Sequence, residues 1–391
     1  MFNILETTTN EAPKWQFDVS KIVFVCLASL GLTACDGGGG GRGAPVTYNY
    51  SQGTPSTLNN ATSNLLLSSD SNLPYISPNS TSYASLKEAH STLNGERYPI
   101  AAQDTNAYVA WEDGWTGAGV KIGVVDGFNT NNKIDAHGDW VSLVINSVAP
   151  ESSLSIQNFL GDGGCGADVT EPTIEFDEAW DLLEKSGHHI VNNSWGISRV
   201  VWDCGGYVGL TSESEWNNLV DSLVKESLIP TEEEPYDPNM LFVFAAGNDA
   251  QECPGGRIED CDLLAAVHDG VRKAGGDASS GIIYVGAVND SGNELTDYSL
   301  KAGNLKNDFI VAHDDILTSG DGQGTSFAAP RVSAASALLR QKFPNLDGNG
   351  LKQVLLQTAT DMGDPGVDEV YGHGKLNIPN AMSPQGKVRP K

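Results

Sequence analysis

Short, nearly continuous apolar segments alternate with amphipathic segments along the last three-quarters of the chain. The apolar runs are residues 120–125, 154–159, 190–193, 241–246 and 282–288. Runs of this length are typical of parallel strands that are buried on both faces. Between them, residues 174–185 and 212–228 carry apolar side chains at helical spacing. The alternation predicts an α/β fold, in which helices cover both faces of a mostly parallel sheet.

The first hundred residues follow a different pattern. Residues 22–32 form an apolar stretch after Lys21, which suits the h-region of a signal peptide and is too short for a transmembrane helix. The stretch ends in Leu32-Thr33-Ala34-Cys35, which looks like a bacterial lipobox. We therefore expect residues 1–35 to be a lipoprotein signal peptide with Cys35 as the lipidated residue. The alternative is an ordinary signal peptide that contains a cysteine by chance.

Residues 36–99 have the composition of a tether. They begin with a glycine run and continue with many serines, threonines and asparagines and few charges until residue 85. Such a segment buries too little apolar surface to offset its chain entropy. A folded pro-domain is the alternative, and the composition argues against it. Residues 100–391 are then the catalytic or binding domain.

Charge and composition exclude several classes of protein. The formal net charge is −27, and a polyanion is repelled by the phosphates of nucleic acids. No apolar run reaches the length of a membrane-spanning helix, which argues against a polytopic membrane protein. Six cysteines in 391 residues do not indicate a small disulfide scaffold.

Ligands of a parallel sheet bind beyond the carboxyl ends of its strands. Four polar residues follow predicted strands or begin predicted helices, and are candidates for such a site. Asp126 follows the first apolar run, His137 precedes an apolar helical segment, and Asn248 follows the fourth run. Ser326 opens a helix of small residues, where backbone N–H groups would stabilise an anion. Each has an ordinary structural interpretation by itself, such as a turn residue or a helix N-cap.

Together the four residues resemble the subtilisin-like serine proteases, the subtilases, whose triad has the order Asp, His, Ser. The segment Gly324–Pro330 is similar to the family's nucleophile signature, and Ala245–Asn248 to its oxyanion segment. Asn192–Gly196 is similar to the substrate-binding strand. The segments 359–363 and 371–376 closely resemble subtilases that are passengers of bacterial autotransporters.

The resemblance implies a subtilisin-like three-layer fold and a serine endopeptidase that forms an acyl-enzyme. Ser326 would attack the peptide carbonyl, His137 would take its proton, and Asp126 would orient the imidazole. The Asn248 amide and the Ser326 N–H would bind the oxyanion. The substrate main chain would lie along Ser194, Trp195 and Gly196. The partners implied are a protein or peptide substrate, with no required cofactor.

Two departures from the family pattern keep an alternative open. Gly127-Phe128 follows Asp126 where the family usually has Thr or Ser and then Gly, and only ten residues separate Asp126 from His137. The alternative is an inactive subtilase fold that binds peptides or a partner. A lipase or esterase is a weaker rival, because it needs Gly-x-Ser-x-Gly, and Ala328 stands where the second glycine would be.

Metals and disulfides complete the expectations. His188-His189 has no adjacent ligand pattern and is interpreted as structural. Calcium stays open, because related proteases often bind it, although no segment matches an EF-hand loop. An exported protein meets an oxidising compartment, where cysteines form disulfides. Cys26 would be lost with the signal peptide and Cys35 lipidated, so four cysteines remain, with three possible sets of pairs. Of these we expect Cys165–Cys204 and Cys253–Cys261.

The predicted location is the bacterial cell envelope. A lipid on Cys35 would anchor the protein to a membrane, with the domain facing out of the cytoplasm. The sequence leaves the choice between inner and outer membrane open.

Overall fold

The computed structural model describes residues 101–128, 137–158, 176–203, 206–227, 239–276, 281–315 and 323–384. The predicted signal peptide and tether, with Cys35, lie outside the described residues, as do Cys165 and Cys204.

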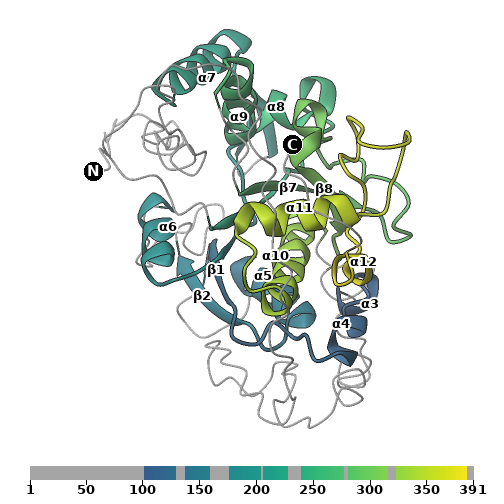
Figure 1. Cartoon of the computed structure of the whole chain (residues 1–391). Helices are drawn as coiled ribbons and strands as arrows, with labels where there is room; N and C mark the ends of the chain where they lie inside the picture. The colour runs from purple at the N-terminus through teal and green to yellow at the C-terminus, as the bar shows by residue number, and fades with distance from the viewer. Residues whose placement is uncertain are drawn as a thin grey trace, which may run out of the picture.

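A six-stranded parallel sheet forms the centre of the molecule (Figure 1), with strand order β2-β1-β3-β6-β7-β8. Its strands are β1 (Lys121–Asp126), β2 (Ser153–Asn158), β3 (Ile190–Asn193), β6 (Leu241–Ala245), β7 (Ile282–Val288) and β8 (Phe309–His313). The first five coincide with the five apolar runs, and β8 is an additional edge strand. A separate antiparallel hairpin joins β4 (Val200–Asp203) and β5 (Gly206–Leu210).

Helices cover both faces of this sheet, which confirms the predicted α/β architecture. One face carries α5 (His137–Val148), α10 (Thr325–Lys342) and α11 (Gly348–Thr358). The other carries α6 (Phe176–Lys185), α7 (Glu213–Ser227), α8 (Ile258–Cys261) and α9 (Leu263–Lys273). The shorter helical segments are α3 (Ala101–Asp104), α4 (Tyr108–Glu112), α12 (Ile378–Ala381), η2 (Pro254–Gly256) and η3 (Gly303–Asp308).

Side chains of the inner strands alternate between two apolar cores, one beneath each helical layer. In β6, Leu241 and Val243 enter the core beside α5 and α10, whereas Phe242 and Phe244 enter the core beside α6 and α9. This period of two explains why the strand has no polar position, since both of its faces are covered.

Helix α10 is buried on almost its whole circumference, between α5 and strands β3, β6, β7 and β8. Its alanines and serines let neighbouring backbones approach closely. Its first turn begins at Thr325, on the side of the sheet where strands β1 and β3 have their carboxyl ends. The sequence therefore brings Ser326 to the carboxyl ends of the parallel strands, the expected place for a site.

Candidate active site

Asp126 and His137 are hydrogen-bonded to each other. Asp126 is the last residue of β1 and is fully buried, and its Oδ1 lies 2.8 Å from Nδ1 of His137, the first residue of α5. Oδ1 also accepts a hydrogen bond from the Gly127 N–H at 2.7 Å. The Gly138 N–H donates to the Gly127 carbonyl at 2.9 Å, which holds the end of β1 against the start of α5.

The surroundings of this pair raise the pKa of both groups. Burial raises the pKa of Asp126 and outweighs the hydrogen bond and charge of His137, which lower it. Burial acts to lower the pKa of His137, but the hydrogen bond and charge of Asp126 outweigh it and raise that pKa overall. The His137 side chain is still 41 % exposed, so its imidazole is accessible from solvent. A base held by a buried carboxylate and open to solvent can exchange a proton with a bound molecule.

Ser326 lies in the first turn of α10 and is turned toward the segment after β3. Its hydroxyl donates to the Ser194 carbonyl at 3.0 Å, and the Ser194 hydroxyl donates to the Ser326 carbonyl at 2.7 Å. Among the described residues the Ser326 hydroxyl makes no hydrogen bond to His137. The imidazole nevertheless lies near the first turn of α10, because its ring centroid is 5.5 Å from that of Phe327, the residue after Ser326.

Asn248 is tied to the serine turn by Thr325. Its Oδ1 accepts hydrogen bonds from the Thr325 N–H and from the Thr325 hydroxyl, each at 2.9 Å. The Thr325 hydroxyl in turn accepts from the Gly247 N–H at 3.1 Å. Because these bonds end on Oδ1, the exposed Asn248 keeps its amide N–H groups for a further acceptor. The amide and the N-terminus of α10 therefore present donors to the same region.

The segment Ser194–Gly196 follows β3 directly and borders the serine turn. Trp195 donates from Nε1 to the Val125 carbonyl at 3.0 Å, and its ring stacks on Trp180 with centroids 6.1 Å apart. The backbone of this segment is thus fixed from β1 and from α6.

Several supporting contacts were not predicted from the sequence, although Asn192 belongs to the segment that resembles the substrate-binding strand. The Ser333 hydroxyl donates to Asn192 Oδ1 at 2.8 Å, and Asn192 Nδ2 donates to the Ser194 hydroxyl at 2.9 Å. Arg331, which is fully buried, binds Asp104 of α3 with a shortest contact of 2.7 Å. The only sequence signal was the polarity of these residues inside apolar segments.

The remaining expectations concern disulfides, the residues His188 and His189, and metal ligands. Cys253 and Cys261 form a disulfide with Cα atoms 6.1 Å apart. His188 is buried with Nδ1 2.9 Å from the Leu183 carbonyl, and burial lowers its pKa. The neighbouring His189 contacts the Arg340 guanidinium. Within the described part of the chain, no three His, Cys, Asp or Glu side chains converge as metal ligands.

Comparison with known families gives a match over the same region. A sequence model described as the "Subtilase family" matches residues 123–374, which include Asp126, His137, Asn248 and Ser326.

Individual relatives are similar over parts of the chain. "Serotype-specific antigen 1" of Mannheimia haemolytica is 29 % identical over 212 residues, 49 % of this chain and 20 % of the relative. "Neisserial autotransporter lipoprotein NalP" of Neisseria meningitidis (strain H44/76) is 28 % identical over 268 residues, 60 % of this chain and 23 % of the relative. The chain thus spans about a fifth of the length of these two relatives. "Subtilisin DY" of Bacillus licheniformis is 25 % identical over 284 residues, 68 % of this chain and 91 % of the relative.

Among solved structures, the protease described as "Prenylagaramide maturation protease PagA" aligns with 71 % of this chain and 97 % of its own, at 22 % identity and a TM-score of 0.45.

Proposed function

We propose, from the premise that the chain belongs to the subtilase family, that it is a serine endopeptidase acting through Asp126, His137 and Ser326. Membership of the family supports hydrolysis of protein or peptide substrates. The observation that carries the assignment of residues is the 2.8 Å hydrogen bond between buried Asp126 and solvent-accessible His137, beside the first turn of α10. No cofactor enters the proposed reaction.

In the proposed reaction Ser326 attacks the substrate carbonyl while His137 accepts the hydroxyl proton. For this step the Ser326 hydroxyl breaks its hydrogen bond to the Ser194 carbonyl by rotation about one side-chain bond. A substrate bound along the segment that contains Ser194 would favour this rotation. Asp126 holds the imidazole by Nδ1, so Nε2 is the nitrogen that receives the proton. His137 then protonates the leaving amine, and water releases the acyl group by the same steps.

The negative charge that forms on the carbonyl oxygen would be stabilised from two sides. The Asn248 amide is oriented by the two bonds from Thr325 to its Oδ1, which leaves Nδ2 as the donor. The Ser326 N–H lies at the positive end of α10. Donors fixed in advance of the reaction are the usual source of the largest stabilisation in acyl transfer.

A fluorophosphonate probe tests the proposal, since it reacts with activated serines. We expect the probe to label the full chain and to lose its target in Ser326→Ala. Ser336→Ala is the matched control, because Ser336 lies buried in the same helix and its hydroxyl donates to the Val332 carbonyl of that helix. Labelling that persists in Ser326→Ala would contradict the assignment.

A partner-binding module is the second candidate function. The observation that favours it is that the Ser326 hydroxyl bonds to Ser194 and has no hydrogen bond to His137 among the described residues. A folded protein that binds peptides and takes up no probe would support this function.

Export and lipid anchoring are proposed from the sequence and from the names of the relatives. One relative is named an autotransporter lipoprotein and another an extracellular serine protease. None of the described helices is both long and apolar enough to cross a bilayer. We expect Cys35→Ser to move the protein from the membrane fraction to the soluble fraction, whereas Cys26→Ser should not. Retention of Cys35→Ser on the membrane would contradict the anchor.

A further inference from the structure

The residues that follow the predicted substrate segment run alongside a second segment, 261–263. The Arg199 N–H donates to the Cys261 carbonyl at 2.8 Å, and the Leu263 N–H donates to the Ile197 carbonyl at 2.9 Å. Asp262, which is 6 % exposed, lies between these two bonds and opposite Ser198. The pairing therefore places a buried carboxylate next to Gly196, at the end of the segment Ser194–Gly196.

The two carboxylate oxygens of Asp262 accept hydrogen bonds from two different segments. Oδ1 accepts from the Ala265 N–H at 2.9 Å and caps α9. Oδ2 accepts from the Ile197 N–H at 3.0 Å. A Cβ atom on Gly196 would lie 2.6 Å from Oδ2, so the carboxylate occupies the space that any larger residue at 196 would need.

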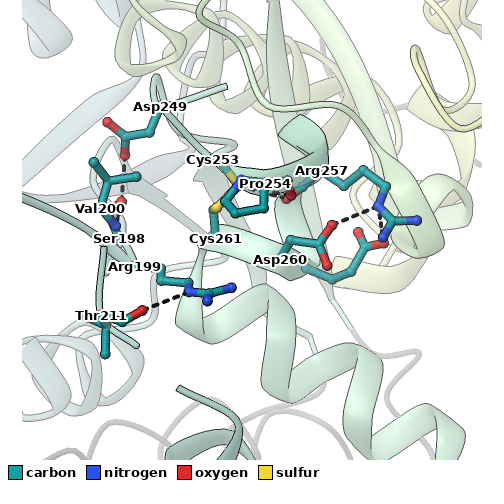
Figure 2. Close-up of a disulfide and its surroundings, with 11 residues drawn as sticks. Ser198, Arg199, Val200, Thr211, Asp249, Cys253, Pro254, Arg257, Asp260 and Cys261 are labelled. Atoms are coloured by element: carbon teal, nitrogen blue, oxygen red, sulfur yellow. Dashed lines mark hydrogen bonds and ion pairs between the residues drawn. A yellow bond between two sulfur atoms is a disulfide. The ribbon is translucent and has the colours of Figure 1, made fainter. Parts of the chain in front are cut away.

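Asp262 is itself held from several directions. The preceding residue, Cys261, is joined to Cys253, as the yellow bond in Figure 2 shows. Cys253 belongs to the turn after Asn248, and its N–H donates to the Asp249 carbonyl at 2.8 Å. The Ser198 hydroxyl donates to Asp249 at 2.6 Å (Figure 2), which closes the arrangement. One disulfide-closed unit thus connects the Asn248 turn with the segment 197–199.

We propose that Asp262 is a positioning residue that fixes the backbone of the Gly196 end of this segment for peptide binding, an inference that rests on the proposed peptidase function. Ser194 is held by Asn192 and Ser326, whereas Oδ2 of Asp262 provides the side-chain contact to the backbone of residue 197. An extended peptide that pairs with this backbone depends on both ends of the segment. The side-chain hydrogen bonds described for Asp126, His137 and Ser326 go to one another's segments and to Ser194, and those of Asp262 go to Ile197 and Ala265.

The electrostatics fit a residue retained for position. Burial, together with the charge of Asp249, raises the pKa of Asp262 to about 6, against the backbone N–H groups that lower it. At neutral pH the group is thus a carboxylate with two accepting oxygens. Capping α9 alone would need only one oxygen, which asparagine or serine also supplies.

The test compares substitutions that keep the cap and remove the second acceptor. In Asp262→Asn one oxygen can still cap α9, but the amide nitrogen cannot accept from the Ile197 N–H. Asp262→Ser keeps a capping oxygen with less bulk and serves if the asparagine variant fails to fold. Asp347→Asn is the matched control, because Asp347 caps α11 through Oδ1, at 2.6 Å from the Gly350 N–H, and no second acceptor contact of its side chain is found among the described residues.

Three quantities are measured on the full chain. They are the KM for fluorescein-labelled β-casein, the Kd of that casein for each variant in a Ser326→Ala background, and the rate of fluorophosphonate labelling. We expect KM and Kd to rise about tenfold in both Asp262 variants, the effect of one lost hydrogen bond to a charged acceptor. The labelling rate should stay within about twofold, and Asp347→Asn should leave all three unchanged.

The outcomes that overturn the inference are distinct from those that overturn the peptidase function. Unchanged KM and Kd, equal changes in Asp347→Asn, or a labelling rate that falls as much as kcat/KM would each remove the positioning role. If the wild-type protein neither cleaves casein nor takes up the probe, the peptidase proposal fails. The Kd values in the Ser326→Ala background still decide the role of Asp262 in that case, and absent casein binding would overturn it.

Discussion

The Arg331 guanidinium donates to both carboxylate oxygens of Asp104, across 227 positions of the sequence, with the shortest contact at 2.7 Å. Arg331 also donates to the carbonyls of Phe327 and Asp315, each at 2.8 Å. This buried cation therefore connects α3 to the helix that begins beside Ser326.

Removing the anion of this pair should destabilise the protein strongly. Asp104→Ala leaves a buried guanidinium without its counter-ion, and we expect a loss of about 3–5 kcal/mol in the free energy of unfolding. Asp181→Ala is the control, because its ion pair with Lys185 is exposed and should contribute less than about 1 kcal/mol. Urea denaturation of both variants checks the difference, and equal losses would contradict it.

The Thr325 hydroxyl should contribute to turnover through Asn248. Thr325→Val removes one of the two bonds that orient Asn248 and keeps the side-chain volume. We expect kcat to fall about tenfold with KM nearly unchanged, since the oxyanion forms only during reaction. Asn248→Ala should cost about 10²–10³. Thr358→Val in α11, whose hydroxyl bonds to the Val354 carbonyl, should leave kcat unchanged.

Local sequence patterns predicted most strands of the sheet and the polar residues of the candidate site, but not the contacts between distant segments. Strands β1 and β6 are continuous apolar runs, so burial on both faces could be inferred from their composition. Strand β8 was missed because its short apolar run lies between Asp308 and a pair of acidic residues.

The partners of the site residues depend on the order of strands in space. Thr325 and Asn248 are 77 positions apart, and each looks like an ordinary turn or cap residue in its own segment. They meet because α10 packs on β6, a relation that no local period encodes. The role of Asp262 was hidden for the same reason, since its contact to Ile197 spans 65 positions.

Asp314 should make the protein less stable as the pH rises. The residue is 1 % exposed, and no described group bonds to its Oδ2. Burial and the neighbouring Asp315 raise its pKa from 3.8 to about 7, although Arg331 and backbone N–H groups lower it. The unfolded chain therefore releases this proton first, and the free energy of unfolding falls between about pH 4 and 7.

Asp314→Asn should remove that loss. We expect a gain of about 2–4 kcal/mol over wild type at pH 8.5 and a much smaller gain at pH 4.5, measured by urea denaturation. Asp308→Asn is the control of opposite sign. Burial acts to raise the pKa of Asp308, but Lys352, His268 and Arg272 outweigh it and lower that pKa, so this variant should lose stability at pH 8.5. A gain for Asp314→Asn that is the same at both pH values would contradict the titration.

The pH dependence of activity should follow His137. Its folded-state pKa is raised above 6.5, so the imidazolium persists to higher pH than in a free histidine. A general base must be neutral, and kcat/KM should therefore rise with pH, with a midpoint above 6.5, and level off in the alkaline range. Rates of fluorophosphonate labelling across pH measure the same group in the free enzyme. A profile that falls through neutral pH would exclude His137 as the base.

The final prediction concerns whether Asp126, His137 and Ser326 act as one unit. Asp126→Asn keeps the volume of a fully buried side chain, so the fold should persist while kcat falls about 10⁴-fold, the cost of the same change in a serine-protease triad. His137→Ala and Ser326→Ala should each abolish nearly all turnover, and the double variant should lose little more, because the proton transfer needs both groups. Circular dichroism establishes that each variant folds, and casein hydrolysis measures the rates.

Losses that multiply in the double variant would mean that the two residues act independently. Near-wild-type activity in Asp126→Asn would mean that the 2.8 Å bond to His137 is structural, and the short connection 127–136 would then be the first place to seek another partner for the imidazole.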